Sequence, residues 1–450
     1  MSSAPASETS TQDTIFALSS GAGRAALAVV RVSGPAAGLA LDRIAAPRPK
    51  PRFAAFRKLR HPETGEEFDH ALVLWFAGPN TETGEDMCEL HLHGGRAVLT
   101  GAFAALSAVP GCRPATAGEF ARRAFENGKL DLTAAEGIID LIDADTEAQR
   151  RQALRQASGE LAQLYDGWRK ELLEARALLE ASIDFSDEGD ISEKAEANGI
   201  GRAVSLAEQI ERHLEDGRRG EIVRDGYRIV IAGPPNVGKS SLMNALARRD
   251  VAIVSEEPGT TRDVLEVRLD LDGYMAIVAD TAGLREAAGT IEQEGIRRAL
   301  KRADEADLVL WLIDATAPVT NVPADLAAHE RRVLRVVNKI DLRDARDVVA
   351  DHAISAREGT GVQGLIAKLA ALAREAAHGA GEPAITQLRH RQQIEACLDA
   401  LKDVRPSSKL PPEIAAEQLR IAAESLGRIV GRIDPEDVLD QVFARFCIGK

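Results

Sequence analysis

The sequence lacks paired cysteines and long apolar runs. Its four cysteines form no C-x-x-C pair, which argues against a disulfide framework or a zinc ribbon and favours a reducing, cytoplasmic compartment. No apolar run reaches the ~18 residues that a membrane span needs, so we expect no membrane partner. Basic and apolar signal-peptide regions are also lacking near the N-terminus, and residues 1–12 are predicted to be a disordered tail.

The sequence also lacks an excess of basic residues, since its net charge is −14. Neutralising nucleic-acid phosphates needs clustered Lys and Arg, so any RNA contact must be local or helped by a partner. The length of 450 residues predicts two to four domains. The shares of hydrophobic (45%) and charged (28%) residues are typical of soluble globular proteins.

Successive patterns of apolar residues along the sequence predict a multidomain α+β and α/β protein. Residues 13–125 contain short β-type runs and one helical run, which predict a small α+β domain. Residues 126–223 have helical spacing of apolar residues and predict an all-α domain. Residues 224–378 alternate strands and helices, as in a doubly wound, mainly parallel sheet. The helical pattern over 384–450 is short for a core of its own, so we expect it to pack on the earlier helices, with the α/β part inserted.

The most informative stretch is Gly233-Pro-Pro-Asn-Val-Gly-Lys239-Ser240, which lies between a strand-like run and a helix-like run. This is the context of a phosphate-binding loop, in which backbone N–H groups and a helix N-terminus face an anion. Lys239 can reach the β- and γ-phosphates, and Ser240 can ligate Mg²⁺. The stretch therefore predicts a nucleoside triphosphate ligand.

Further motifs follow in the order that a GTPase needs. Asp280-Thr-Ala-Gly283 can hold the Mg²⁺ shell and meet the γ-phosphate, and Thr261 can complete the Mg²⁺ coordination. Asp341 can accept two N–H bonds from guanine, which adenine cannot offer, so the motifs predict GTP with Mg²⁺. The GTP-binding residues expected from these motifs are Asn236, Val237, Gly238, Lys239, Ser240, Ser241, Gly259, Thr260, Thr261, Asp280, Thr281, Ala282, Gly283, Asn338, Lys339, Asp341, Ser355, Ala356 and Arg357.

Leu284 stands directly after Gly283, where many regulatory GTPases place a Gln that orients the attacking water. A leucine cannot orient water, so another polar group must do so, or hydrolysis must be slow. The nearby candidates are Glu286, Glu292 and Glu294.

With the terminal Phe446-Cys-Ile-Gly-Lys450, these motifs make the chain resemble the MnmE (TrmE) family of bacterial tRNA modification GTPases. The likeness covers nearly the whole chain after the N-terminal tail, including Thr83-Gly-Glu-Asp86 and Lys129-Leu-Asp-Leu132. It implies a tetrahydrofolate-binding and dimerisation domain over 13–125, a helical domain in two parts (126–223 and 384–450), and an inserted TrmE-type G domain.

The resemblance implies a homodimer that works with the FAD- and NADH-using protein MnmG (GidA) in a heterotetramer. Together they would add an aminomethyl or carboxymethylaminomethyl group to C5 of the wobble uridine (position 34) of certain tRNAs. The carbon would come from a tetrahydrofolate derivative in the 5-formyl or methylene form. The resemblance assigns the folate contacts to Arg31, Glu89, Lys129 and Lys450. From the residues alone, Arg31 and Glu89 could equally be ordinary charges on strands.

The resemblance also implies K⁺-stimulated hydrolysis, in which Glu292 orients the water and Lys239 contacts the phosphates. Asn236 would coordinate K⁺, and a monovalent cation there can offset charge as an arginine would. The further K⁺ ligands would be Ser255, Glu257 and Thr260, and the same loop would bring Glu256 and Pro258 to the GTP. Cys447 could be a reactive thiol, or it could only pack.

Two alternative functions stay open. One is a regulatory GTPase for ribosome or RNA assembly without one-carbon transfer, which folate binding would exclude. The other is a scaffold whose GTP only locks a dimer, which a K⁺-dependent hydrolysis rate would argue against.

Overall fold

A computed structural model of the chain describes residues 13–21, 23–185, 189–249, 251–253, 266–280, 306–323, 332–377, 383–408, 410–433, 436–446 and 448–449. Two compact units make up the chain, Met1–Ile139 with Val430–Lys450 and Asp140–Ile429. The finer domain boundaries expected above remain a prediction, and the expected tail over 1–12 lies outside the described residues.

The first unit is built on a mixed six-stranded sheet in the order β3-β4-β5-β2-β1-β6. All neighbouring strands are antiparallel except β1 and β6. The strands are β1 Thr14–Leu18, β2 Ala25–Ser33, β3 Ala55–Arg60, β4 Glu67–Phe76, β5 Met87–Gly94 and β6 Cys112–Pro114.

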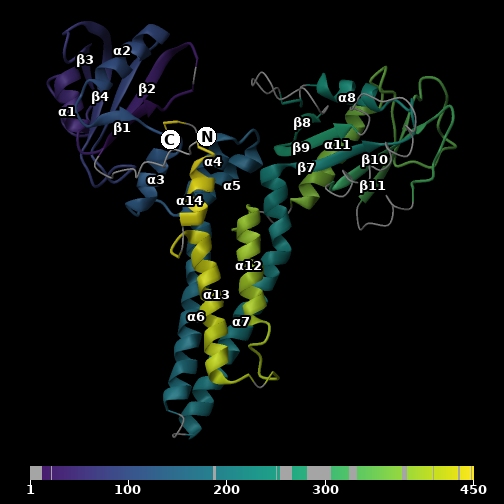
Figure 1. Cartoon of the computed structure of the whole chain (residues 1–450). Helices are drawn as coiled ribbons and strands as arrows, with labels where there is room; N and C mark the ends of the chain where they lie inside the picture. The colour runs from purple at the N-terminus through teal and green to yellow at the C-terminus, as the bar shows by residue number, and fades with distance from the viewer. Residues whose placement is uncertain are drawn as a thin grey trace, which may run out of the picture. The chain divides into compact units, whose positions relative to one another are not determined.

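A small cluster of Ile15, Ala17, Ala115 and Phe120 covers one edge of this sheet's second face, but the main hydrophobic core lies on the first face. Helices α1 (Ala37–Ile44) and α2 (Arg96–Ser107) pack there against alternate strand residues such as Val30 and Leu90 (Figure 1). Because side chains alternate between faces along a strand, their neighbours Arg31 and Glu89 lie on the opposite face. That second face is called the open face below.

The C-terminal segment returns to the first unit. Helix α14 (Glu436–Phe443) packs beside α3 (Glu119–Glu126) and α4 (Leu132–Ile142) through a core that includes Phe443. Farther along, Ile448 bridges to Ala117, and the Ser19 hydroxyl donates to the Gly449 carbonyl at 2.8 Å. The last described residues therefore lie against β1 and the start of α3.

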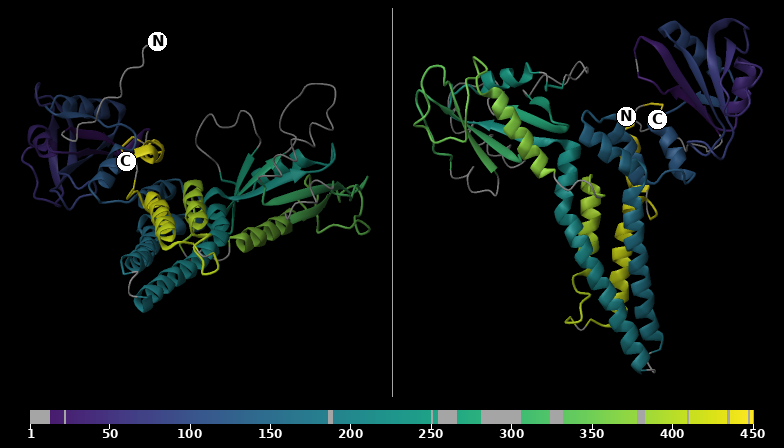
Figure 2. Two further views of the ribbon diagram at one scale, coloured as in Figure 1. Left: turned by 60° about the horizontal axis from the view of Figure 1, so that its bottom comes forward. Right: turned by 180° about the vertical axis from the view of Figure 1, so that it is seen from behind.

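The second unit contains a bundle of long helices that lie side by side in the views of Figures 1 and 2. Helices that follow the α/β part pack on helices that precede it: Arg391 pairs with Glu221 at 2.9 Å, and the Thr386 hydroxyl meets Gln156 at 2.9 Å. The prediction of an α/β part inserted into a helical domain is thus confirmed. The bundle helices are α5 Glu147–Ala157, α6 Glu160–Asp184, α7 Gly189–Asp225, α12 Leu388–Leu401 and α13 Pro412–Val430.

The α/β part has a second six-stranded sheet, in the order β12-β11-β10-β7-β9-β8, in which only β8 is antiparallel to its neighbour. Its central strands β7 and β10 are nearly continuous apolar runs because both faces are covered. Its elements are β7 Tyr227–Ala232, α8 Lys239–Ala247, β8 Glu266–Leu271, β9 Tyr274–Asp280, β10 Leu308–Asp314, β11 Arg332–Asn338, β12 His352–Ala353 and α11 Val362–Ala376. The predicted fold class is confirmed.

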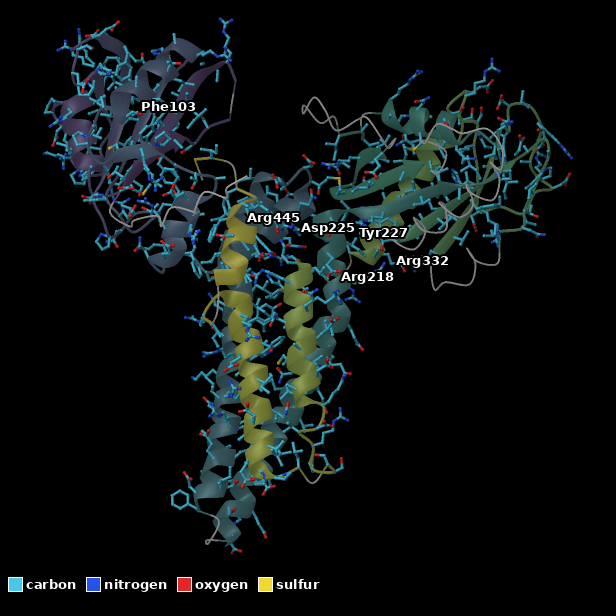
Figure 3. All side chains as sticks on the ribbon, in the orientation of Figure 1. Phe103, Arg218, Asp225, Tyr227, Arg332 and Arg445 are labelled. Atoms are coloured by element: carbon cyan, nitrogen blue, oxygen red, sulfur yellow. The ribbon has the colours of Figure 1, made fainter. Side chains whose placement is uncertain are left out.

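Helix α7 leads directly into β7, the strand before the predicted phosphate loop. Asp225 and Tyr227 mark this junction in Figure 3, and Gly226 between them has a left-handed φ of 92°. Asp307 ties both elements together, because it pairs with Arg218 at 2.7 Å and accepts from the Arg228 amide at 2.9 Å. The nucleotide motif therefore begins on a strand that the helical bundle anchors.

None of the helices in the described ranges is both long enough and apolar enough to cross a membrane.

Candidate functional site

The predicted phosphate loop lies between β7 and the first turn of α8. Two of its glycines are needed for steric reasons. A Cβ on Gly233 (φ 150°) would lie 2.7 Å from the Leu312 carbonyl oxygen, and one on Gly238 (φ 102°) would lie 2.3 Å from Asn338 Nδ2. The loop backbone therefore packs closely against the ends of β10 and β11, as a backbone cradle for an anion requires.

Lys239 and Ser240 begin α8 directly after this loop. The Lys239 ammonium group points back across the loop and donates to the carbonyls of Gly233 and Pro234, each at 3.0 Å. Ser240 and Ser241 are exposed at the helix N-terminus, where backbone N–H groups and the helix dipole favour anions.

Asn338 connects the phosphate loop to the predicted base-binding loops. Its side chain is 2% exposed; Nδ2 donates to the Val237 carbonyl at 2.9 Å, and Oδ1 accepts from the Ala356 amide at 3.0 Å. The Ser355 hydroxyl donates to Asp341 at 2.7 Å and thereby orients the carboxylate predicted to read guanine. Arg357, the next residue of that motif, is exposed.

Lys339 makes a second connection to the phosphate loop. Its ammonium group donates to the Asn236 carbonyl at 2.7 Å and to Asp314 at 2.5 Å. Both Asn236 (φ 61°) and Lys339 (φ 68°) have left-handed backbone conformations. Burial of Asp314 opposes its ionisation, but hydrogen bonds from Lys339 and Thr316 prevail and lower its pKa. The ion pair therefore stays charged.

Asp314 is a residue that sequence reasoning missed. It ends β10 and stands in register with Asn338, which ends the parallel neighbour β11. The available signal was an acidic residue closing a buried strand, since the carboxyl ends of parallel strands meet at the ligand-binding edge of such sheets.

Several predicted residues lie outside the described residues. They are Ser255, Glu256, Glu257, Pro258, Gly259, Thr260, Thr261, Thr281, Ala282, Gly283, Leu284, Glu286, Glu292, Glu294, Cys447 and Lys450. Asp280 closes β9, and only its backbone is described.

The predicted folate residues Arg31 and Glu89 are direct partners across β2 and β5 on the open face of the first sheet. Nε and Nη2 of Arg31 donate to one oxygen of Glu89 at 3.3 and 3.2 Å. The other Glu89 oxygen lies 3.2 Å from His91 Nε2. The structure therefore brings these two residues together and adds His91, which lies on the same strand face as Glu89.

Lys129 is exposed in the segment after α3, and its side-chain stem lies near the loop between β4 and β5. A Cβ on Gly84 of that loop would come within 3.2 Å of Lys129 Cε. The same loop contributes Glu82, which pairs with Arg31 Nη1 at 2.6 Å and which sequence reasoning missed.

A buried ionic network connects this loop to α3. Arg123 is 6% exposed and pairs with Glu85 at 3.2 Å and with Glu119 at 3.1 Å, while Arg113 pairs with Glu119 at 2.6 Å. Burial raises the pKa of Glu119, but the Arg113 hydrogen bond, the Thr116 amide and both arginines outweigh burial and lower the pKa to about 2.

The architecture and the site together define the class of protein. An α+β N-terminal domain is followed by a helical domain, into which a P-loop GTPase fold is inserted. Family models agree with this class: one described as the MnmE helical domain matches residues 132–447, and one described as the GTP-binding protein TrmE N-terminus matches 14–129.

Full-length relatives give the family. The tRNA modification GTPase MnmE of Methylorubrum populi is 52% identical over 441 residues, covering 98% of both chains. The protein of that name from Rhodopseudomonas palustris is 51% identical over 453 residues, 98% of this chain and 100% of its own. The chain belongs to the MnmE (TrmE) family.

Solved structures match part of the chain. The FeoB G-domain of Methanococcus jannaschii is 25% identical and covers 33% of this chain and 97% of its own, at a TM-score of 0.25. Era of Aquifex aeolicus bound to GDP and AlF4⁻ is 24% identical and covers 41% and 69%, at a TM-score of 0.25. The family assignment depends on the full-length relatives.

Proposed function

We propose that this chain is a K⁺-stimulated GTP hydrolase in the modification of tRNA wobble uridines. The observation that carries the GTPase part is the Asn338 side chain, which joins the phosphate loop to the guanine-binding loops. The tRNA part is supported by relatives named tRNA modification GTPase that are about half identical over nearly the whole chain.

The described residues fit GTP and Mg²⁺. Lys239 would exchange its loop carbonyls for phosphate oxygens, and the Ser240 hydroxyl would ligate Mg²⁺ together with Thr261. Asp341, oriented by Ser355, would accept two N–H bonds from guanine and so select GTP over ATP. The Mg²⁺ ion would offset phosphate charge.

Potassium would bind beside the phosphates through Asn236, with Ser255, Glu257 and Thr260 as further ligands. The left-handed backbone of Asn236, fixed by Lys339, supports a specific position for this side chain. A cation there would stabilise charge that develops during hydrolysis, and Glu292 would orient the water in place of the glutamine that Leu284 replaces.

The first unit would bind a tetrahydrofolate derivative through Arg31, Glu89, Lys129 and Lys450. The Arg31–Glu89 pair on the open face supports this assignment, because a guanidinium suits a folate carboxylate and Glu89 holds that guanidinium in position. The one-carbon unit would reach C5 of uridine 34 as an aminomethyl or carboxymethylaminomethyl group, with MnmG (GidA) supplying FAD and NADH chemistry.

The chain would act in the cytoplasm as a homodimer and form a heterotetramer with MnmG. Exposed apolar side chains on the open face, Leu27, Phe56 and Leu72, support contact with another protein surface there.

Steady-state GTP turnover in KCl against NaCl tests the hydrolysis mechanism. Wild type should be about tenfold or more faster in KCl, and Asn236→Ala should lose that difference. Asn244→Ala, which changes an exposed Asn on α8, is the matched control. Equal rates in both salts would refute the K⁺ role. Nucleoside analysis of tRNA from a strain without the protein tests the second part, and unmodified wobble uridines are expected.

A further inference from the structure

Arg31 is held by two carboxylates, and they hold it differently. One oxygen of Glu89 accepts hydrogen bonds from both Nε and Nη2, at 3.3 and 3.2 Å. This pair therefore lacks the geometry of the strongest Arg–carboxylate contacts, in which each of two nitrogens donates to its own oxygen. Glu82 meets Nη1 at 2.6 Å. The shorter contact of the guanidinium is thus with Glu82, a residue of the loop between β4 and β5.

The backbone on both sides of Glu82 is fixed without help from Arg31. The Thr81 hydroxyl donates to the Glu85 carbonyl at 2.6 Å. Thr83 is fully buried; its hydroxyl lies 2.7 Å from Ser33 Oγ, and its carbonyl accepts from Asn127 at 2.7 Å. Glu82 can therefore leave Arg31 by rotating its side chain, while the loop stays in place.

Exposure differs between the members of this group. The side chain of Glu82 is 53% exposed, whereas those of Arg31 and Glu89 are 16% and 19% exposed. An ion pair with an exposed carboxylate contributes little to stability. Glu82 does, however, occupy the guanidinium face that an incoming carboxylate would need.

We propose that Glu82 is an internal competitor that occupies Arg31 and is displaced by a carboxylate of the folate glutamate. This inference rests on the proposed folate site and adds a residue that regulates its affinity. Glu89 keeps the guanidinium in place during the exchange, so the cost of ligand entry is loss of the Glu82–Arg31 pair alone. Glu82 lowers the affinity for anionic folates and leaves the affinity for uncharged analogues unchanged.

Calorimetric titration of the full-length protein with 5-formyltetrahydrofolate tests this role. Glu82→Gln should bind about two- to fivefold more tightly than wild type, the range that exposed ion pairs are worth. Glu66→Gln, which removes an exposed carboxylate from the turn before β4, controls for the general change in charge and should bind as wild type does. A 5-formyl-6-methyltetrahydropterin, which has no carboxylate, should bind wild type and Glu82→Gln equally.

The outcomes separate this inference from the proposal on which it rests. If wild type binds no folate, the folate proposal fails and the inference fails with it. If wild type binds but Glu82→Gln binds equally or more weakly, Glu82 does not compete, and only the inference fails. Equal tightening for the carboxylate-free pterin would also overturn it. Unchanged thermal unfolding of Glu82→Gln shows that the comparison concerns folded protein.

Discussion

Asn338 Nδ2 donates to the Val237 carbonyl across 101 residues of sequence, at 2.9 Å and fully shielded from solvent. The same side chain accepts from Ala356 at 3.0 Å, so one amide fixes the phosphate loop against both base-binding loops. Phosphate and base positions are thereby set by one group, which explains why a buried polar residue ends β11.

Replacing Asn338 with Ala should weaken GDP and GTP binding together. The Val237 carbonyl and the Ala356 amide would lose this buried partner, which costs about 1–3 kcal/mol for each unsatisfied group. We expect affinity to fall about 10- to 100-fold, measured by titration with a fluorescent guanine nucleotide. Asn244→Ala should bind as wild type does, and a wild-type affinity for Asn338→Ala would show that the bridge does not organise the site.

Neutralising Asp314 should weaken nucleotide binding more mildly. Asp314→Asn keeps the shape but removes the charge opposite Lys339, whose ammonium fixes the Asn236 carbonyl. We expect GDP to dissociate about 3- to 10-fold faster, since a loss of about 1 kcal/mol corresponds to roughly fivefold. Asp344→Asn makes the same exchange in the exposed pair with Arg346 and should change nothing. Equal dissociation rates for both variants would exclude a role for the Asp314 pair.

The sequence predicts well what depends on local pattern. The apolar run Tyr227–Ala232 is a strand with these bounds, because a central parallel strand is apolar on both faces. Lys239 and Ser240 follow it at the first turn of α8, as the glycine spacing requires. The helical return after the α/β part was also predictable, because a short amphipathic tail needs another surface to bury its apolar face.

Residues whose roles depend on contacts between distant segments could not be predicted. Asp314 meets Lys339 only because β10 and β11 are neighbours in register. Glu82 meets Arg31 because a loop after β4 folds back over β2, a contact that no spacing in the sequence indicates. The predicted residues Glu292 and Thr261 stay predictions.

Lowering the pH should destabilise the helical bundle through His213. This imidazole lies edge-on to Trp168 (centroids 5.1 Å apart) and 3.1 Å from the Tyr165 hydroxyl. Burial lowers the pKa of His213 to about 4. The negative charge of Asp216 opposes this shift, and His390 lowers the pKa by a smaller amount. The unfolded chain takes up this proton near pH 6.5 and the folded chain does not. Stability is therefore full above pH 6.5 and falls as the pH drops toward 4, by about 2 kcal/mol at pH 5.

Urea unfolding followed by tryptophan fluorescence at pH 8 and pH 5 measures this loss. His213→Phe retains an aromatic ring but has no proton to bind, so it should lose less stability than wild type between the two pH values. An identical loss in both proteins would assign the pH dependence to other groups.

The buried network around Glu119 should be essential for the first unit. Glu119 is 5% exposed and is the shared partner of Arg113 and Arg123, so Glu119→Ala takes a buried carboxylate from both arginines and leaves Arg123 paired with Glu85 and Arg113 with Asp13. We expect a loss of about 3 kcal/mol, measured by chemical unfolding at pH 7. Because the pKa of Glu119 is lowered to about 2, its contribution is complete above the unfolded value near 4.3 and is lost as the pH falls through about 2. Glu126→Ala, in the exposed pair with Arg122, should cost under about 1 kcal/mol. Similar losses for the two variants would mean that burial does not increase the contribution of the Glu119 network to the free energy of unfolding.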